Sequence, residues 1–371
     1  MKKQLFFLLM LSLPVISPAQ EPGIKFETGS FQDALLKAKE AGKYLFIDCY
    51  ATWCAPCKEL EKQVFTEPSV AEYFNTKFIN MKLDIEKGEG IDLRKRFGVQ
   101  PIPTLLFINS DGRVEHKFIG SSSPADFMKR AREVFTNENR YGVLERKYEA
   151  GERAPEFMTV YLNELLDQSE YAKVKNLLSG LLDGQSVEDL CNNSFWPIMT
   201  RNFIAEFNSV YYRFLIDNRE AWITNVGKEA FNKKLSWLYK RYASIWIFSG
   251  SKNGDETENI AAARADVVKL YLEEERDILL MLDIATARVH RDYDQFILLV
   301  EKNYDVLPAE DKFTIFIDSD FFSKEADPVQ CSRYLMIIEK FVSEPGNKNY
   351  SSRLDRIVKG LKNVASKTNE S

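Results

Sequence analysis

Histidine and cysteine are both scarce in this sequence, and their scarcity limits the chemistry that the chain can support. The 371 residues include two histidines, His116 and His290, and five cysteines. Five cysteines are too few for a scaffold held together by disulfides. Two of them are separated by two residues, but a zinc site would need two more ligands, and the chain has no second pair of this kind. We therefore expect no metal site.

Positive charge and long apolar runs are also lacking. The net charge is −5, which gives the chain no overall electrostatic reason to bind nucleic acid or an anionic membrane surface. No segment has eighteen uninterrupted apolar residues, so we expect no stable insertion into a membrane. A hydrophobic content of 45% excludes a disordered chain, and the length allows two or three domains.

The first nineteen residues have the order of a secretory signal. Lys2 and Lys3 precede an apolar stretch from Leu5 to Ile16, and small residues stand three and one positions before a cut after Ala19. The apolar stretch is shorter than the roughly 20 residues that span a bilayer. We expect residues 1–19 to be removed and the mature protein to be exported, most simply to a bacterial periplasm, without a lipid anchor.

Residues 23–137 alternate between strand and helix patterns. A short apolar run rich in β-forming residues predicts a strand at 43–50, and a second strand is predicted at 78–84. Two more are predicted at 104–108 and 113–118, on either side of a hairpin turn. Apolar spacing and a proline in the first turn predict helices at 31–41, 54–65 and 124–135, and leave open whether the second continues at 70–73. A β-α-β unit followed by a hairpin and a helix gives a sheet covered by helices on both faces.

Beyond residue 137 the strand patterns nearly vanish. Apolar residues recur at helical spacing, as at Val174, Leu178 and Leu181, which predicts a stack of helical hairpins with no fixed repeat length. The stretch 314–317 is ambiguous between helix and strand. We therefore divide the chain into a signal peptide at 1–19, a mixed α/β domain at 24–137 and an α-helical domain of unknown role at 138–371.

The pair of closely spaced cysteines is the most informative feature. Cys54 and Cys57 lie at the predicted start of a helix, where they can form a small disulfide loop reversibly. Unpaired N–H groups and the helix dipole favour a thiolate at Cys54. Cys54 would attack a substrate disulfide, and Cys57, one turn further in, would resolve the mixed disulfide.

The motif Trp-Cys-Ala-Pro-Cys at 53–57, after a strand and at a helix start, resembles that of the thioredoxin superfamily. The resemblance implies an α/β thioredoxin fold over 24–137, followed by the all-α domain. The stretch 31–70 is most similar to the C-terminal domain of the transmembrane thiol:disulfide interchange reductases. Nothing in the resemblance concerns residues 138–371.

The resemblance also implies roles for residues around the dithiol. Pro103 matches the family's cis-proline and would pack against the dithiol, while Ile102 would offer backbone groups to an extended substrate and Trp53 would complete this platform. Asp48 matches the buried acid beneath the site and Lys82 the strand lysine that pairs with it. Burial should raise the pKa of that carboxyl group, which could accept the proton of Cys57; a structural ion pair is the alternative.

We expect from these residues an exported thiol–disulfide oxidoreductase that reduces protein disulfides without a bound cofactor. Its partners would be protein disulfides and a thiol electron donor or acceptor. The neutral Ala55-Pro56 dipeptide, which lacks histidine, favours a reductant. A disulfide isomerase or oxidase stays open, as does an adaptor whose helical domain binds a partner protein.

The other three cysteines have no predicted role in the chemistry. Cys49 follows Asp48 in a strand, so its side chain faces the opposite side of the sheet and packs there as a buried thiol. Cys191 and Cys331 lie in the helical part, and whether they pair cannot be decided from the sequence.

Overall fold

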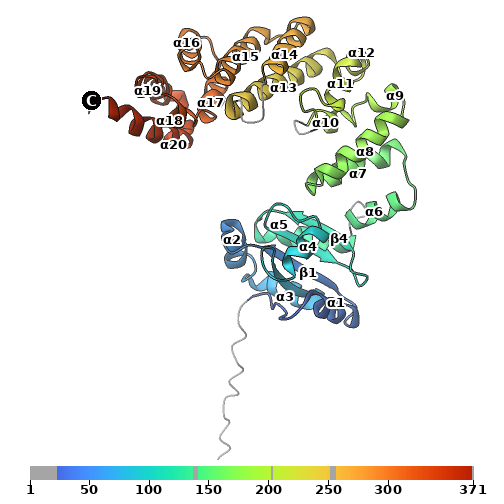
Figure 1. Cartoon of the computed structure of the whole chain (residues 1–371). Helices are drawn as coiled ribbons and strands as arrows, with labels where there is room; N and C mark the ends of the chain where they lie inside the picture. The colour runs from blue at the N-terminus through green and yellow to red at the C-terminus, as the bar shows by residue number, and fades with distance from the viewer. Residues whose placement is uncertain (1–22, 137–140, 202–203, 251–255, 370–371) are drawn as a thin grey trace, which may run out of the picture. The chain divides into compact units, whose positions relative to one another are not determined.

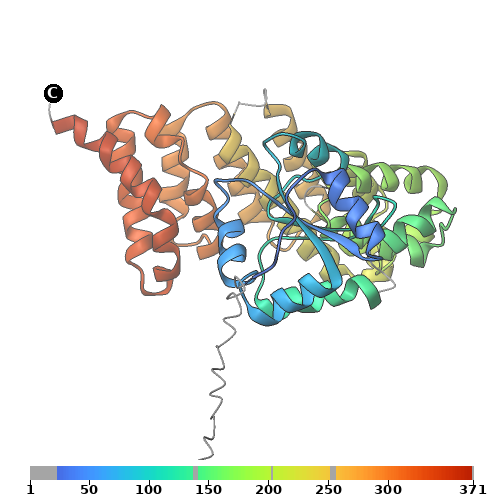
Figure 2. The same ribbon diagram turned by 90° about the horizontal axis from the view of Figure 1, so that it is seen from below.

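The structure, a computed structural model, describes residues 23–136, 141–201, 204–250 and 256–369, so the predicted signal peptide lies outside the described residues. The chain divides into two compact units, Met1–Glu170 and Tyr171–Ser371, which Figure 1 and Figure 2 show from two directions. Each unit is described by itself below.

A mixed four-stranded sheet forms the centre of the first unit. Strand β1 pairs in parallel with β2 and antiparallel with β3, and β3 pairs antiparallel with β4, which gives the order β2-β1-β3-β4. The strands are β1 (Tyr44–Tyr50), β2 (Phe78–Asp84), β3 (Thr104–Ile108) and β4 (Val114–Ile119). All four strands were predicted, and the β-α-β unit followed by a hairpin is confirmed.

Helices cover both faces of this sheet because side chains of a strand alternate between its faces. From β1, Phe46 points into a core formed with α2, α3 and α5, whereas Leu45 and Ile47 point into a second core formed with α1 and α4. The helices are α1 (Phe31–Glu40), α2 (Ala55–Gln63), α3 (Pro68–Lys77), α4 (Gly90–Arg96) and α5 (Pro124–Thr136). The region after Pro68 is a separate helix, and α4 was not predicted.

Local signals fix where several of these helices begin. Ser30 caps α1 in a capping box with Asp33, each side chain accepting a hydrogen bond from the other's backbone N–H. Glu67 caps α3 and is followed by Pro68, whose fixed φ suits the first turn. Cys54 occupies the same capping position in α2, so the backbone that starts this helix also places a sulfur atom at its positive end.

Two further helices, α6 (Tyr141–Glu149) and α7 (Pro155–Asp167), belong to the first unit. Helix α6 packs beside β4 (Figure 1), so closely that a Cβ added to Gly142 would lie 2.7 Å from the Cα of Glu115. An ion pair joins Arg146 of this helix to the buried Glu115 at 2.5 Å. The boundary that we predicted near residue 137 falls beside residues 137–140, which the structure does not describe, and the compact unit continues to Glu170.

The second unit consists of helices throughout its described residues, which confirms the predicted helical class. The stretch 314–317, ambiguous in the sequence, is helical. No helix among the described residues is long and apolar enough to cross a membrane. The helices are α8 (Tyr171–Gly184), α9 (Val187–Leu190), α10 (Trp196–Met199), α11 (Val210–Asp217), α12 (Arg219–Val226), α13 (Lys228–Ser249), α14 (Thr257–Leu270), α15 (Glu275–Val289), α16 (Tyr293–Asn303), α17 (Ala309–Ile317), α18 (Phe322–Glu325), η1 (Pro345–Asn347), η2 (Ser366–Asn369), α19 (Pro328–Ser343) and α20 (Lys348–Ala365).

Candidate active site

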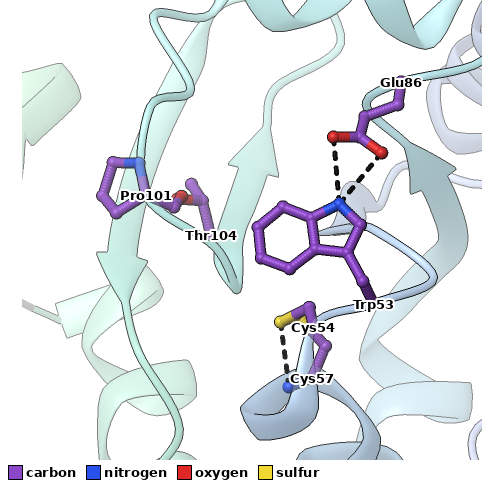
Figure 3. The surroundings of a disulfide bond; sticks show 6 residues. All are labelled: Trp53, Cys54, Cys57, Glu86, Pro101 and Thr104. Carbon is purple, nitrogen blue, oxygen red and sulfur yellow. Dashed lines mark hydrogen bonds between the residues drawn. A yellow bond between two sulfur atoms is a disulfide. The ribbon is translucent and has the colours of Figure 1, made fainter. Parts of the chain in front are cut away.

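The two cysteines of the motif form a disulfide at the start of α2, just beyond the end of β1. The Cα atoms of Cys54 and Cys57 are 5.4 Å apart, and both residues are almost fully buried in this oxidised state. The Sγ atom of Cys54 accepts a hydrogen bond from the backbone N–H of Cys57 at 3.2 Å (Figure 3). In the reduced protein the same N–H and the helix dipole would stabilise a thiolate at Cys54.

The loop before β3 lies opposite the dithiol. The peptide bond between Ile102 and Pro103 is cis, and Pro103 is buried directly before Thr104, which pairs with Cys49 at the end of β1. The Thr104 hydroxyl donates a hydrogen bond to the Pro101 carbonyl at 2.6 Å, which closes the loop (Figure 3). Among the residues that the structure describes, the backbone N–H and C=O of Ile102 have no hydrogen-bond partner, so they remain available to a ligand.

Trp53 presents a large apolar surface beside the disulfide. Its side chain is 66% exposed, which is unusual for so large an apolar group. The indole N–H donates to both carboxylate oxygens of Glu86, at 3.1 and 3.0 Å, and this contact holds the ring in one orientation (Figure 3). Sequence reasoning placed Trp53 at the site and missed Glu86.

A buried carboxyl group lies on the face of β1 that α2 covers. Asp48 is 2% exposed, and its Oδ1 atom has no hydrogen-bond partner within the described part of the chain. Burial in this apolar core raises the pKa of Asp48 to about 7, while the charge of Lys82 acts in the opposite direction. A carboxyl group with such a pKa can gain or lose a proton at neutral pH.

Lys82 reaches a different carboxylate from the one that we expected. It is the register partner of Asp48 across the parallel pair β1–β2, so both side chains point to the same face of the sheet. Its ammonium group forms an ion pair with Glu61 of α2 at 2.6 Å and lies 4.9 Å from the centre of the Tyr50 ring. Lys82 is therefore held between α2 and the sheet. Its ion pair is with Glu61, and it affects Asp48 only because its positive charge lowers the pKa of that carboxyl group.

Glu61 is the second residue that sequence reasoning missed. It lies four residues after Cys57, so one turn of α2 places both side chains on the same face. Its negative charge adds to the burial that raises the pKa of Asp48. Helical spacing from the dithiol was the signal that could have found it.

The raised pKa of Asp48 predicts how stability depends on pH. An unfolded aspartate has a pKa of about 3.9, so between pH 4 and 7 the unfolded chain releases a proton that the folded chain retains. The free energy of unfolding should therefore fall as the pH rises from about 4 to 7, by up to about 4 kcal/mol, and change little from this cause outside that range. Urea unfolding at a series of pH values should show this fall in the natural chain, and the fall should be smaller in Asp48→Asn.

The variant Glu61→Gln tests how much the charge of Glu61 contributes to the raised pKa of Asp48. Removing its charge lowers the pKa of Asp48, so the fall in stability should end at a lower pH than in the natural chain. Glu59→Gln is the matched control, because Glu59 is exposed on the same helix. Equal pH profiles for the Glu61 variant and the natural chain would mean that Glu61 does not act on Asp48.

The remaining cysteines are free thiols and are fully buried. Burial holds the pKa of Cys49 well above its ordinary value and raises that of Cys191 to about 12 and that of Cys331 to about 11. None of the three has the exposed, positively polarised surroundings of a reactive thiol. The described residues also contain no group of three or more His, Cys, Asp or Glu side chains that could hold a metal ion.

Part of the chain is similar to known proteins. Residues 31–135 match the family model of a thioredoxin-like domain. A segment of 102 residues is 31% identical to the thiol:disulfide interchange protein DsbD of Pseudomonas fluorescens, covering 27% of this chain and 18% of that protein. Another of 72 residues is 38% identical to thioredoxin-1 of Drosophila melanogaster, covering 19% of this chain and 63% of that protein.

A solved structure matches a similar share of this chain. A proposed disulphide-isomerase from Bacteroides thetaiotaomicron is 48% identical over 32% of this chain and 99% of its own, with a TM-score of 0.30. The chain spans less than a quarter of the interchange proteins that it matches, and the family model ends at residue 135.

Proposed function

Residues 31–135 belong to the thioredoxin-like family, and on this premise we propose that the protein is an exported oxidoreductase that reduces disulfide bonds in other proteins. The observation that carries the proposal is the position of Cys54 at the positive end of α2, with the N–H of Cys57 directed at its sulfur. Relatives named for thiol:disulfide interchange support the same chemistry.

The proposed reaction transfers two electrons through a mixed disulfide. The thiolate of reduced Cys54 attacks one sulfur of a substrate disulfide, which forms a bond from Cys54 to the substrate and releases the other substrate sulfur as a thiolate. Cys57 then loses its proton to Asp48 and attacks the sulfur of Cys54. The substrate leaves as a dithiol, and the disulfide between Cys54 and Cys57 remains for an external thiol donor to reduce.

Substrate binding would use the surfaces around the dithiol. An extended segment of the substrate can pair with the unpartnered backbone N–H and C=O of Ile102. The exposed ring of Trp53 can cover apolar side chains of that segment. Such backbone pairing fixes the direction of the segment without selecting its sequence, which suits an enzyme with many protein substrates.

Export and the role of the helical unit complete the proposal. Basic, apolar and small residues in order at 1–19 support export, most simply to a periplasm where disulfides persist. Residues 171–371 form a compact unit outside the matched segment, which supports a separate role in binding a protein partner. No cofactor is needed, because the two sulfur atoms store the electrons.

The reduction potential of the full chain tests the direction of electron flow. Equilibration with defined ratios of reduced and oxidised glutathione, followed by alkylation of free thiols, measures the potential of the Cys54–Cys57 pair. We expect a value near the roughly −270 mV of a reducing thioredoxin, because no histidine separates the cysteines. A value between roughly −120 and −180 mV would instead identify an oxidase or isomerase.

A further inference from the structure

From residue 233 to its end, helix α13 of the second unit is exposed along one narrow face. The exposed side chains follow one another at intervals of four or three residues, which places them all on the same side of the helix. They are Lys233, Trp237, Arg241, Ile245 and Phe248. We call these five residues the α13 stripe.

The α13 stripe has the composition of an interface and not that of an ordinary solvent-exposed face. The side chains of Trp237, Ile245 and Phe248 are 46%, 40% and 58% exposed. The exposed face of a helix usually carries polar and charged residues, and exposed large apolar side chains normally occur singly. Tryptophan and arginine, both present in the stripe, are enriched among the residues that supply most of the binding energy of protein interfaces.

A groove lies beside the first three residues of the stripe. These residues line one side of it, and Glu310 and Thr314 of α17 line the other (Figure 1). Met281 of α15 also contributes to its lining. The volume of the groove is about 350 Å³, which is within the roughly 300–1,000 Å³ typical of ligand sites.

The unpaired charges along this groove are mainly positive. Two of its carboxylates, those of Glu274 and Asp311, already form ion pairs with Lys240, the second at 2.7 Å. Lys233 and Arg241 form no ion pair with any residue that the structure describes. A ligand that carries carboxylates would therefore find partners here.

A third cation adds to the positive charge of the stripe. The Nζ atom of Lys234 lies 4.0 Å from the centre of the Trp237 ring. Burial and the nearby charge of Arg201 lower the pKa of Lys234, which shows that the surroundings disfavour its charged form. Although Asp318 lies near Arg241, the cations along the stripe outnumber the carboxylates that have no ion pair.

We propose that the α13 stripe and its groove bind an acidic amphipathic helix of a partner protein. The apolar side chains of that helix would pack on Trp237, Ile245 and Phe248, and its carboxylates would pair with Lys233 and Arg241. The inference rests on the proposed role of residues 171–371 in binding a protein partner, and it names the surface and the chemistry of that partner.

The geometry of the stripe favours a helix over an extended segment. Four of its residues, from Lys233 to Ile245, are spaced four apart, and such a row forms a ridge that packs into a groove between the side chains of a facing helix. The stripe extends for about 22 Å, at a rise of about 1.5 Å per residue. An extended segment would need a free strand edge, whereas α13 uses its backbone N–H and C=O groups within the helix.

The test measures binding of labelled peptides of about 16 residues to the full chain by fluorescence anisotropy. The first peptide carries leucines along one helical face and glutamates on the others. The second has lysines in place of the glutamates, and the third has the composition of the first in an order that distributes leucine over all faces. The first should bind at least about tenfold more tightly than either of the others. Equal affinities for the three peptides, or no binding of the first, would overturn the proposal.

Charge variants test the contribution of the cations. Lys233→Gln together with Arg241→Gln should weaken binding of the acidic peptide at least about tenfold. Lys302→Gln together with Lys359→Gln is the matched control, because it removes two exposed positive charges elsewhere in the unit, and it should leave the affinity unchanged. Equal effects of the two pairs would mean that the peptide responds only to the overall charge, which would overturn the proposal.

Trp237→Ala tests the apolar part of the surface. It should also weaken binding of the acidic peptide at least about tenfold. Met336→Ala is the control, since Met336 is 61% exposed on α19 and lies outside the stripe. Circular dichroism should confirm that all variants fold. A natural chain that is a dimer, and that Trp237→Ala converts to a monomer in size-exclusion chromatography, would show that a second copy occupies the stripe and would overturn the proposal.

The reductase activity is measured separately on the same proteins. All of these variants should reduce insulin at the rate of the natural chain, because none of the substituted residues belongs to the dithiol site. A natural chain that binds the acidic peptide without reducing insulin would contradict the proposed reductase and support the helix-binding surface. A natural chain that reduces insulin without binding the peptide would overturn the surface and support the reductase.

Discussion

Replacing Cys54 by serine is expected to lower the rate of insulin reduction by the full chain to the uncatalysed background. A serine hydroxyl at the same helix start cannot form a disulfide, so neither the mixed disulfide nor the internal one is available. The assay follows precipitation of the insulin chains with dithiothreitol as the electron source. The loss should be complete and not graded, because the other three thiols are fully buried and their pKa values are raised, which keeps them protonated.

The matched control for this variant removes a buried thiol. Cys191→Ala should reduce insulin at the natural rate, since Cys191 is fully buried in the second unit and its pKa is raised to about 12. Retention of activity in Cys54→Ser would refute the assignment of the nucleophile. Loss of insulin reduction in Cys191→Ala, with an unchanged fold, would mean that Cys191 takes part in the reaction, which we have excluded.

Replacing Phe46 by alanine is expected to destabilise the first unit by about 3–5 kcal/mol. Phe46 is fully buried in β1, two residues before Asp48, and its ring lies 4.8 Å from that of Phe74 and 5.2 Å from that of Phe107. Removing it leaves a cavity among close-packed aromatic rings, which cannot all move to fill the space. Pulse proteolysis in urea, reading the fragment that contains Cys54, measures the loss.

Leu36→Ala is the control for this loss. Leu36 is 52% exposed on α1, so the substitution removes little buried surface and should change the free energy of unfolding by less than about 1 kcal/mol. Similar effects of both substitutions would mean that the aromatic core does not determine the stability of the sheet that carries the dithiol.

Local patterns were sufficient to predict the sheet and most helices of the first unit. The predicted strand at 78–84 has the bounds of β2, whose apolar residues alternate with Asn80, Lys82 and Asp84 as in a strand with two unlike faces. The start of α2 was predicted because the capping residue and the proline act within one turn. The thioredoxin fold of this region was therefore predictable from short segments.

Helix α4 shows where local patterns were insufficient. It has seven residues and begins with Gly90, a poor helix former. The glycine is needed for packing, because an added Cβ would lie 2.0 Å from the carbonyl oxygen of Asp84. Contacts distant in sequence thus fix this helix. The same holds for α6, whose Arg146 pairs with Glu115 of β4, a residue 31 positions earlier in the chain.

The site was predictable to the extent that its residues follow one another in the chain. The two cysteines and Trp53 come from one motif, and the cis bond before Pro103 agrees with the resemblance on which that residue was chosen. The ion pair between Lys82 and Glu61 was not predictable, because the lysine has two carboxyl groups within its reach and only the three-dimensional arrangement decides between them.

Trapping of a mixed disulfide tests the central claim most directly. In Cys57→Ser the resolving thiol is absent, so Cys54 should remain bound to its substrate after the first attack. We expect mass spectrometry of this variant, incubated with oxidised insulin, to find an insulin chain linked through Cys54 and released by dithiothreitol. An adduct on another cysteine, or none under conditions in which the natural chain reduces insulin, would contradict the account.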